Sequence, residues 1–580
     1  MWACGWQVSV ATGGYDMRPS DRLPAAGREL LATLDPEQLP EGPVRQALVV
    51  LLNLVEDLRR EVAQLRAENQ RFKDEINRLK GEQGQPQIKG NTPKPPPPTP
   101  TNYSSEKARH VPKAWSKGKK LDQVRIDREQ TLEVDPSTLP GDAEFKGYED
   151  VVVQDIVFGT DTVLFHKQKY YSPAEGRTYR ASLPAGYHGQ FGPGLKALAL
   201  ALYFGANVSE PKILELYRSV GMVISDGQLS NLLIKDQEAF HAEKTAVHEA
   251  GLASTPWQHL DDTSTRINGQ NQYCQVLCNP FYTSYQTTES KDRPTVLTVL
   301  RGGRPRAYLF NAEAESLLAG VLSNVARGRL SVLPRDQVLD EATMLGLLDE
   351  RLAQLGPQQR KWVRDATAVA AYHAEVGFPV VKLLVCDDAP QFTWLTQELA
   401  LCWVHEARHY HKLLPCFAPH IKLLDAFMQR FWDYYDELLA YREHPTVEDR
   451  ERLAVQWGEL FSTRTGYFAL DDRIAKTEEK QAALLMVLAH PEIPLHNNPA
   501  ELGARQRVRK RDVSFGPRTA EGAQAWDTFM TLAATATKLG VSFYAYLRDR
   551  ISKANQLPGL DCLIAARARE LNLGASWAGS

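Results

Sequence analysis

Three acidic residues, far apart in the chain, have the sequence surroundings of catalytic carboxylates. Asp261 lies in the strand-like segment WQHLDDTSTRI, Asp387 directly follows the apolar run VVKLLVC, and Glu501 precedes a run of arginines in HNNPAELGARQRVRKR. Carboxylate oxygens are the ligands that Mg²⁺ and Mn²⁺ prefer. Two such ions can activate a water molecule and stabilise the leaving oxygen in phosphodiester cleavage. These residues are therefore candidates for a metal-dependent phosphodiester site.

Each of the two aspartates has an acidic neighbour, Asp262 and Asp388, that competes for the same role. Successive side chains of a strand point to opposite faces, so only one member of each pair can face a shared ion. Acidic residues at strand ends also form turns, and a carboxylate in the first turn of a helix is stabilised by the helix dipole. From the residue types alone, the choice between these roles stays open.

The segments that carry the first acid indicate strands. Trp257–Ile267 is expected to be a strand, and an Asn-Gly turn leads to a second strand over 272–278. The apolar stretches 295–300 and 306–310 predict two further strands. We expect these pieces to form an antiparallel meander.

The later segments predict a buried strand, a helix and an all-α insertion. Val380–Cys386 has the unbroken apolar character of a strand buried on both faces. Sites in open α/β sheets gather at the carboxyl ends of such strands, where Asp387 lies. A helix is expected to begin near Pro499 and to carry Glu501. Helical periodicity recurs in four segments: 335–375, 418–443, 446–463 and 479–490.

Three groups of basic residues suit contacts to DNA phosphates. The first follows Glu501 and consists of Arg505, Arg507, Arg509, Lys510 and Arg511. The second surrounds Trp115 and includes Lys113, Lys117, Lys119 and Lys120, although a solvated basic loop has the same composition. The third is the pair His405 and Arg408, which suits contacts to DNA or to the active site. A buried, hydrogen-bonded histidine is the alternative for His405.

Residues 45–81 have the pattern of a coiled coil. Apolar residues alternate spacings of three and four from Leu48 to Leu79. Asn69 falls at a core position, where a buried amide favours a parallel two-stranded pairing. We expect a homodimer through this helix, the alternative being a long amphipathic helix packed on its own chain. The proline-rich and basic segment 82–123 is expected to be a linker.

Two further regions precede the acids. Short β-rich pieces at 124–183 predict a small β domain. Residues 184–250 are helical, with Gly221 at a turn and Ser225 as a helix cap, a spacing compatible with a DNA-binding helix-turn-helix. The other expected divisions are an N-terminal segment 1–44, a first core part 251–417, an all-α insertion 418–490, a last core part 491–550 and a C-terminal segment 551–580.

Charge and cysteine content limit the class of protein. The 580 residues carry 68 Lys and Arg against 71 Asp and Glu, a net charge of −3, so affinity for nucleic acid has to come from local patches. Seven cysteines without a CxxC pair fit a reducing compartment, and we expect a cytoplasmic location. Apolar runs fall short of the roughly 20 residues of a membrane span, so no membrane partner is expected. The spacing of Cys402, His405, His409 and Cys416 is too irregular to predict a closed zinc site.

Four motifs occur in an order that resembles one known family. They are LDDT at 260–263, VCDD at 385–388, CWVHEARHY at 402–410 and HNNPAE at 496–501. Over roughly residues 180–550, this series is similar to that of bacterial insertion-sequence transposases of the insertion-sequence sixty-six family.

The resemblance implies an α/β, ribonuclease-H-like catalytic core with an all-α insertion and a DDE triad. The triad falls on Asp261, Asp387 and Glu501, which the resemblance makes both the catalytic residues and the ligands of Mg²⁺ or Mn²⁺, as two ions. The N-terminal coiled coil also resembles the family's arrangement. Many members carry a CxxC zinc ribbon between coiled coil and core, whereas here no cysteine lies between Cys4 and Cys274. The β-rich region at 124–183 is the candidate to take its place, so the family's mode of end recognition is not carried over to this chain.

The expected function is that of a DNA transposase. Such an enzyme cleaves DNA at transposon ends and transfers the freed strand into target DNA, so terminal inverted repeats and target DNA are its expected partners. Two alternatives stay open: a transposase-derived DNA-binding protein without catalysis, and a nuclease of the same fold that does not join strands.

Overall fold

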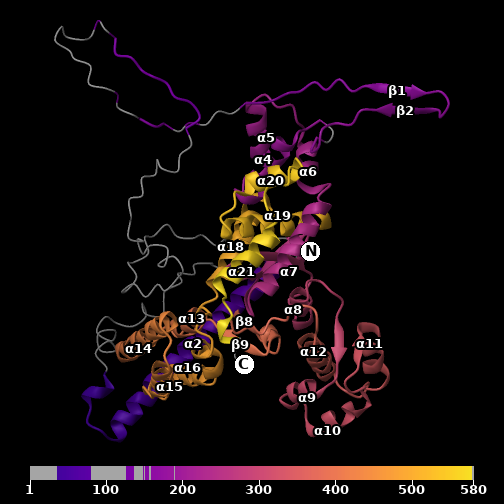
Figure 1. Ribbon diagram of the computed structural model, residues 1–580. Coiled ribbons are helices and arrows are strands. Elements are labelled where there is room, and N and C mark those ends of the chain that lie inside the picture. Colours follow the sequence, from indigo (N-terminus) through magenta and orange to yellow (C-terminus); the bar gives the residue numbers. More distant parts are fainter. Residues whose placement is uncertain are drawn as a thin grey trace, which may run out of the picture.

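The central feature of the molecule is a five-stranded sheet with helices on both faces, which makes the fold mixed α/β (Figure 1). The computed structural model describes residues 35–79, 126–135, 137, 148, 151–153, 155, 159–187 and 190–577.

The sheet joins an antiparallel meander to parallel strands, in the order β5-β4-β3-β8-β9. The meander is β3 (Trp257–Ile267), β4 (Gln270–Cys278) and β5 (Thr283–Thr288), and β8 (Leu383–Cys386) and β9 (Glu398–Leu401) run parallel to β3. Asn268 and Gly269 both have positive φ, as the tight β3–β4 turn requires. The strands expected around Asp261 and before Asp387 are thus confirmed.

The predicted meander is wrong beyond β4. The stretch 295–300 is not a strand but lies in α8 (Arg293–Leu300), because Asp292 accepts a hydrogen bond from Thr295 N as an N-cap and a proline occupies the first turn. The third strand is β5, whose polar sequence TSYQTT hides it from a search for apolar alternation. The stretch 306–310 contains β6 (Ala307–Leu309), which pairs with β7 (Val338–Asp340) in a separate sheet.

Both faces of the central sheet are buried. In β8, Leu384 and Cys386 belong to one hydrophobic core and Leu383 and Val385 to the other, as strand alternation requires. Helices of the first core include α4 (Pro193–Leu200), α7 (Glu238–Ser254), α18 (Asn498–Ser514), α19 (Ala520–Lys538), α20 (Phe543–Ile551) and α21 (Leu560–Leu571).

Helix α19 covers the outer edge of the sheet. Thr535 Oγ1, Thr531 Oγ1 and the Asp527 carboxylate accept hydrogen bonds from backbone N–H groups of β5. Their spacing of four residues places them on one helix face, opposite the free edge of the strand. A sheet edge that would otherwise expose unpaired donors is therefore satisfied by side chains.

Two helical additions flank the sheet. One follows β6 and contains α9 (Ala312–Ala319), α10 (Asn324–Gly328), α11 (Glu341–Glu350) and α12 (Pro357–His373), in agreement with the helical stretch expected at 335–375. The other follows α13 (Trp403–His411) and contains α14 (Ala418–Glu443), α15 (Val447–Phe461), α16 (Phe468–Glu478) and α17 (Gln481–Leu484). The helical character expected at 418–490 is therefore confirmed, and this stretch is called the helical insertion below. It packs around Trp403, whose indole N–H donates to Leu484 O at 2.9 Å.

Helix α2 (Pro43–Leu79) forms where the coiled coil was expected, but one of its faces is occupied within the chain. Leu52, Asn53 and Glu56 are buried against the insertion. The Asn53 amide donates to Gly466 O and accepts from Phe468 N, at 2.9 and 2.8 Å. The expectation of a helix set apart from the core by a linker is therefore wrong for its N-terminal half. The apolar stripe assigned to the dimer remains exposed at Leu51, Val55, Leu58, Val62, Leu65, Phe72 and Ile76.

The β-rich region expected at 124–183 forms a hairpin, not a domain, in the residues that the structure describes there. Strands β1 (Lys169–Ser172) and β2 (Arg177–Arg180) pair antiparallel, and their side chains are almost all exposed. A short strand pair without apolar residues on a common face cannot enclose a core.

The two consecutive helices expected around Gly221 are present. Helices α5 (Glu210–Ser219) and α6 (Asp226–Ile234) are joined through Gly221, which has a φ of +83°. Ser225 caps α6, with Gln228 completing a capping box. Binding of DNA by these helices stays a prediction.

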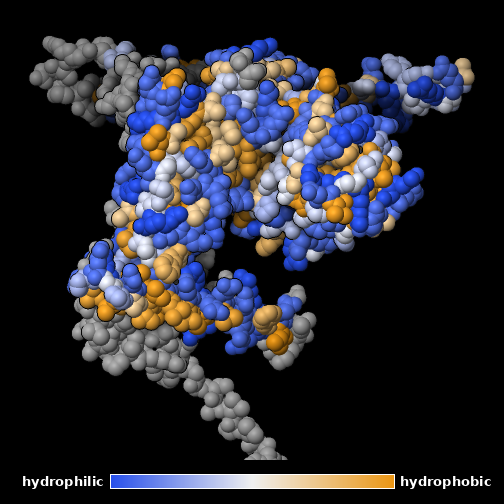
Figure 2. All heavy atoms as spheres, turned by 90° about the horizontal axis from the view of Figure 1, so that it is seen from below, coloured by the Kyte–Doolittle hydropathy of each residue, from blue (hydrophilic) through white to orange (hydrophobic). Residues whose placement is uncertain are grey.

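The described helices include none with the length and apolar content that crossing a bilayer demands. On the face seen in Figure 2, hydrophilic side chains predominate and hydrophobic ones are scattered between them.

Candidate active site

The candidate acids Asp261 and Asp387 lie level with each other on adjacent parallel strands. Trp257 pairs with Leu383, an offset of 383 − 257 = 126 residues. The same offset carries position 261 to position 387, the residue that follows β8. Asp387 accepts a hydrogen bond from Ala389 N at 3.2 Å, which holds the turn after the strand. The register of the sheet therefore brings the two acids to one place.

Glu501 reaches the same place from α18, which begins at Asn498 with Pro499 in its first turn. The helix lies close to β4, since a Cβ at Gly503 would come within 2.7 Å of Val276 Cγ1. Tyr285 Oη also donates to Gly503 O at 3.1 Å. Glycine at position 503 thus permits the close approach that sets Glu501 over the sheet.

Asn497 connects this helix to the strands and to α13. Its side-chain NH₂ donates to Leu260 O at 2.7 Å, its Oδ1 lies 3.0 Å from His259 Nδ1, and its backbone N–H donates to Cys402 Sγ at 3.2 Å. The residue is fully buried. A buried amide with all of these contacts fixes the start of α18 relative to β3, one residue before Asp261. Sequence reasoning missed this role, although the HNNPAE motif contains the residue.

The three carboxylates act on one another electrostatically. Burial, with added repulsion from Glu501 and Asp387, raises the pKa of Asp261 to about 7, although a hydrogen bond from Asp262 N opposes the rise. Like charges gathered in a partly buried place favour either a proton or a bound cation. The predicted triad residues are therefore brought together, from three distant parts of the chain.

Glu501 is flanked by the two α13 residues expected near DNA or the active site. Arg408 donates to Glu501 Oε2 at 3.1 Å, and His405 Nδ1 lies 3.5 Å from Glu501 Oε1. Burial lowers the pKa of His405, although the negative charge of Glu501 acts to raise it. Ligand atoms of Cys402, His405 and Glu501 lie within 4.8 Å of one another. His405 and Arg408 thus contact the candidate catalytic glutamate.

The residues present fit a divalent cation. Glu501 Oε1 and His405 Nδ1 are buried and have no hydrogen-bond partner among the described residues. Buried polar atoms are normally satisfied, so this unpaired carboxylate oxygen of Glu501, whose charge also raises the pKa of Asp261, is open to a bound cation.

The rival aspartates have other partners. Asp262 accepts hydrogen bonds from Lys291 and Gln391, each at 3.2 Å, and Asp388 pairs with Lys480. Asp388 also lies within 4.8 Å of ligand atoms of Glu406 and His409.

Glu406 is already satisfied by other side chains. It accepts hydrogen bonds from Arg473 at 2.6 Å, from Thr477 at 2.5 Å and from Lys480 at 3.0 Å. This second cluster is a buried ion-pair network, which accounts for its carboxylates without a metal.

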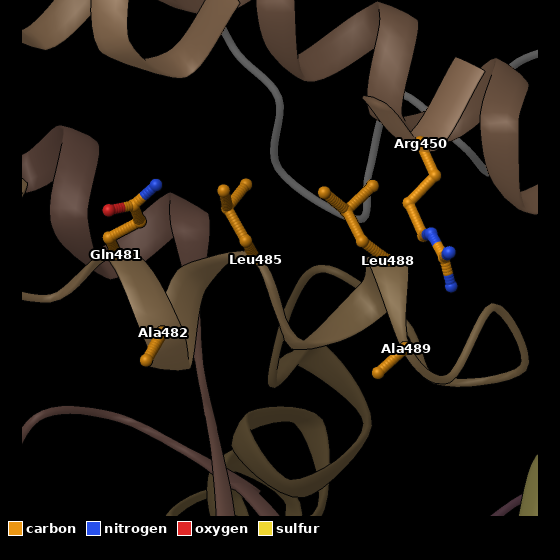
Figure 3. Close-up of a pocket in the computed structure, with 6 residues that line it drawn as sticks. All are labelled: Arg450, Gln481, Ala482, Leu485, Leu488 and Ala489. Atoms are coloured by element: carbon orange, nitrogen blue, oxygen red, sulfur yellow. The ribbon is translucent and has the colours of Figure 1, made fainter. Parts of the chain in front are cut away.

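A polar cavity of about 450 Å³ lies beside Asp262. It lies between the loop before α8, helix α12 and the turn after β8, and its charged lining consists of Lys291, Arg293 and Lys361 with Asp292 and Asp365. Lys291 links it to Asp262. A second cavity, of about 430 Å³, lies in the helical insertion and is lined mainly by apolar residues (Figure 3). Its one charged residue is Arg450, and it contains none of the candidate acids.

The basic run after Glu501 divides into exposed and buried residues. Arg505 and Arg509 are exposed, and Arg511 is partly exposed and donates to Ser264 O. The prediction that Arg507 and Lys510 contact DNA is wrong in this structure, because both are buried. Helix α18 presents only one side to solvent, and these two residues face the core.

Both buried cations have protein partners. Arg507 pairs with Asp527 at 3.1 Å. Lys510 Nζ donates to Tyr203 O and lies 3.1 Å from the centre of the Tyr203 ring. Burial lowers the pKa of Lys510 to about 7. The other predicted DNA contacts, Lys113, Lys117, Lys119 and Lys120, lie outside the described residues.

Comparison with known proteins gives one informative match. The chain is similar to the uncharacterized protein y4jO of Sinorhizobium fredii, with 32% identity over 323 residues. The aligned part covers 55% of this chain and 99% of y4jO. No family model matches the chain, and no solved structure matches it.

Proposed function

We propose that this chain, which belongs to the same protein family as the uncharacterized protein y4jO, is a DDE-type DNA transposase with a ribonuclease-H-like core. The observation that carries the proposal is the convergence of Asp261, Asp387 and Glu501 from β3, the end of β8 and the first turn of α18. The motif series around these residues, which resembles that of the insertion-sequence sixty-six transposases, supports the same conclusion. A cytoplasmic location is part of the proposal.

Asp261, Asp387 and Glu501 would hold Mg²⁺ or Mn²⁺, as two ions. Bound there, the ions would activate a water molecule and stabilise the leaving oxygen of the phosphodiester. Arg408, which is about half exposed, pairs with Glu501 and is free to turn toward a phosphate when Glu501 binds a cation. Arg505 and Arg509 would hold the DNA backbone along the exposed side of α18.

The reaction has two balanced steps. In the first, a water oxygen bonds to phosphorus and the 3′ oxygen leaves, takes up a proton and becomes a free 3′ hydroxyl. In the second, that hydroxyl attacks a phosphodiester of target DNA, so one P–O bond forms as another breaks. The proposed catalytic residues serve both steps, because each exchanges oxygens at a phosphorus atom beside the same carboxylates.

The proposed enzyme acts as a homodimer. The exposed apolar stripe of α2 supports pairing with a second copy, since such a stripe is costly to leave in water. Because α2 also docks on the insertion through Asn53 and Glu56, dimerisation would connect the helical insertions of two copies.

The proposal is tested with duplexes that carry the inverted repeats flanking the gene, mixed with a supercoiled target plasmid and Mg²⁺. Wild-type protein is expected to release 3′ hydroxyl ends and to join them to the plasmid. Glu501→Gln is expected to bind the duplex and give neither product. Cleavage without joining would identify a nuclease instead, provided that duplexes supplied with free 3′ hydroxyl ends are not joined to the plasmid either. Binding without cleavage would identify a DNA-binding protein.

A further inference from the structure

The β1–β2 hairpin projects from the body of the molecule (Figure 1). Residues 161–182 are exposed apart from Ser172. Tyr170 and Tyr171 have 65% and 63% of their surface accessible. The arm also extends outward in Figure 2, where hydrophilic colours dominate it. An isolated two-stranded hairpin is only marginally stable in water, so an arm of this kind is expected to have a partner.

The charge of the arm indicates the chemistry of that partner. Between positions 166 and 180 there are four cationic side chains, Lys167, Lys169, Arg177 and Arg180, and one carboxylate, Glu175. The chain as a whole is slightly acidic, so this is a local concentration of positive charge. The aromatic side chains are tyrosines, which combine an apolar ring with a hydrogen-bonding hydroxyl and so suit a polar surface.

The strand register places two of the cations side by side on one face. Lys169 pairs directly with Arg180, and Tyr171 with Thr178 on the same face, while Tyr170, Tyr179 and Arg177 lie on the opposite face. Like charges directly opposite each other destabilise a hairpin, unless an anion lies between them. The cationic face is therefore built for an anionic partner and not for an apolar protein surface.

The root of the arm is held firmly near α5 and α6. Gly186 has a φ of +83°, and a Cβ there would lie 2.7 Å from the backbone of Ile551 and Ser552 at the end of α20. The Phe165 and Tyr187 rings meet edge to face at 5.3 Å and join the two stems. Gln190 accepts a hydrogen bond from Gln228 of α6 at 3.3 Å. The arm is thus anchored at the end of the molecule that carries α5 and α6 (Figure 1).

We propose that the β1–β2 arm is a DNA-binding ribbon that lies in the major groove of duplex DNA, with Lys169 and Arg180 toward the phosphates. Strands of a ribbon lie about 4.8 Å apart, and the major groove, about 12 Å wide, admits two of them. The inference rests on the proposed function for its choice of DNA as the partner. The arm would contact the duplex away from the candidate carboxylates, and it belongs to a segment that precedes the proposed catalytic core in the chain.

The test is duplex binding by the full-length protein, measured in EDTA by fluorescence anisotropy over a series of salt concentrations. The variant Lys169→Ala/Arg180→Ala is compared with Lys476→Ala/Arg567→Ala, which removes two exposed cations from other surfaces. The arm variant is expected to bind about tenfold more weakly and to lower the salt slope by about 2, since each phosphate contact contributes about 0.9. The control variant is expected to match the wild type.

Equal affinity and salt slope for the arm variant and the wild type would overturn the proposal. If the arm variant changed its oligomeric state but bound DNA like the wild type, the proposal would also be overturned, because the arm would then contact a second copy of the chain. Because the assay contains EDTA, its outcome does not depend on cleavage. A loss of affinity in the arm variant would support the arm whether or not the wild-type protein cleaves DNA, which separates failure of the arm from failure of the catalytic proposal.

Discussion

Replacing Asp261 by asparagine is expected to stabilise the metal-free protein at alkaline pH. Burial, with repulsion from Glu501 and Asp387, raises the pKa of Asp261 to about 7. Because the folded-state pKa lies above the unfolded value, folding takes up a proton between about pH 4 and pH 7, and stability from this group falls as pH rises through that window. Above it, the folded protein holds an unfavourable charge that asparagine lacks.

The size of the effect follows from the pKa. A rise from 3.8 to about 7 amounts to ~4 kcal/mol at about 1.4 kcal/mol for each pKa unit. This value is an upper limit, because water reaches the partly buried carboxylate and screens its charge. We expect Asp261→Asn to raise the free energy of unfolding by about 1–2 kcal/mol. In a chain of this size that gain raises the apparent midpoint of thermal unfolding by roughly 1–2 °C.

Scanning calorimetry in EDTA at pH 8 and pH 5 measures the difference. The gain is expected at pH 8 and should disappear at pH 5, where wild-type Asp261 is already protonated. Asp262→Asn is the matched control, because its carboxylate is paired with Lys291 and its loss brings no gain. An Asp261→Asn protein that unfolds at or below the wild-type midpoint at pH 8 would refute the argument from crowded charge.

Four further substitutions test positioning, DNA binding, core stability and the docking of α2. Asn497→Ala is expected to abolish cleavage while circular dichroism stays unchanged, and to cost about 1–3 kcal/mol in chemical unfolding, because Leu260 O loses its buried donor. Arg509→Ala should weaken duplex binding and lower the salt slope of binding by about 1. Arg507→Ala should leave that slope unchanged and destabilise the fold by about 3–5 kcal/mol, since Asp527 loses its buried partner. Glu56→Ala should speed proteolysis at the start of α14 in the monomeric protein, because the backbone N–H groups of Cys416 and Phe417 lose their acceptor; equal rates would contradict the docking of α2.

Local sequence patterns predicted the structure correctly where a segment's own residues determine its conformation. The apolar run before Asp387 predicts a strand buried on both faces, and β8 is that strand. The Asn-Gly pair fixed the β3–β4 turn because both residues tolerate positive φ. Proline at position 499 placed the start of α18 to within one residue.

The errors arose where a distant segment decides the structure. The polar side chains of β5 have distant partners, His248 for Ser284 and Asp527 for Thr287, which no local pattern reveals. Arg507 and Lys510 belong to a basic run, yet their position on α18 makes them face the core. Their partners, Asp527 and Tyr203, lie far from them in the sequence. The docking of α2 likewise depends on polar contacts of Asn53 and Glu56 that a search for apolar spacing passes over.

The central claim is that Asp261, Asp387 and Glu501 surround one divalent-cation site, and localised cleavage of the protein by bound Fe²⁺ tests it most directly. Fe²⁺ in place of Mg²⁺, with ascorbate and peroxide, generates radicals that cut the backbone beside the ion. The account predicts three cuts, near positions 261, 387 and 501, which excess Mg²⁺ suppresses and Asp261→Asn abolishes. Cuts confined to the neighbourhood of Glu406 and His409, or cuts that persist in Asp261→Asn, would contradict it.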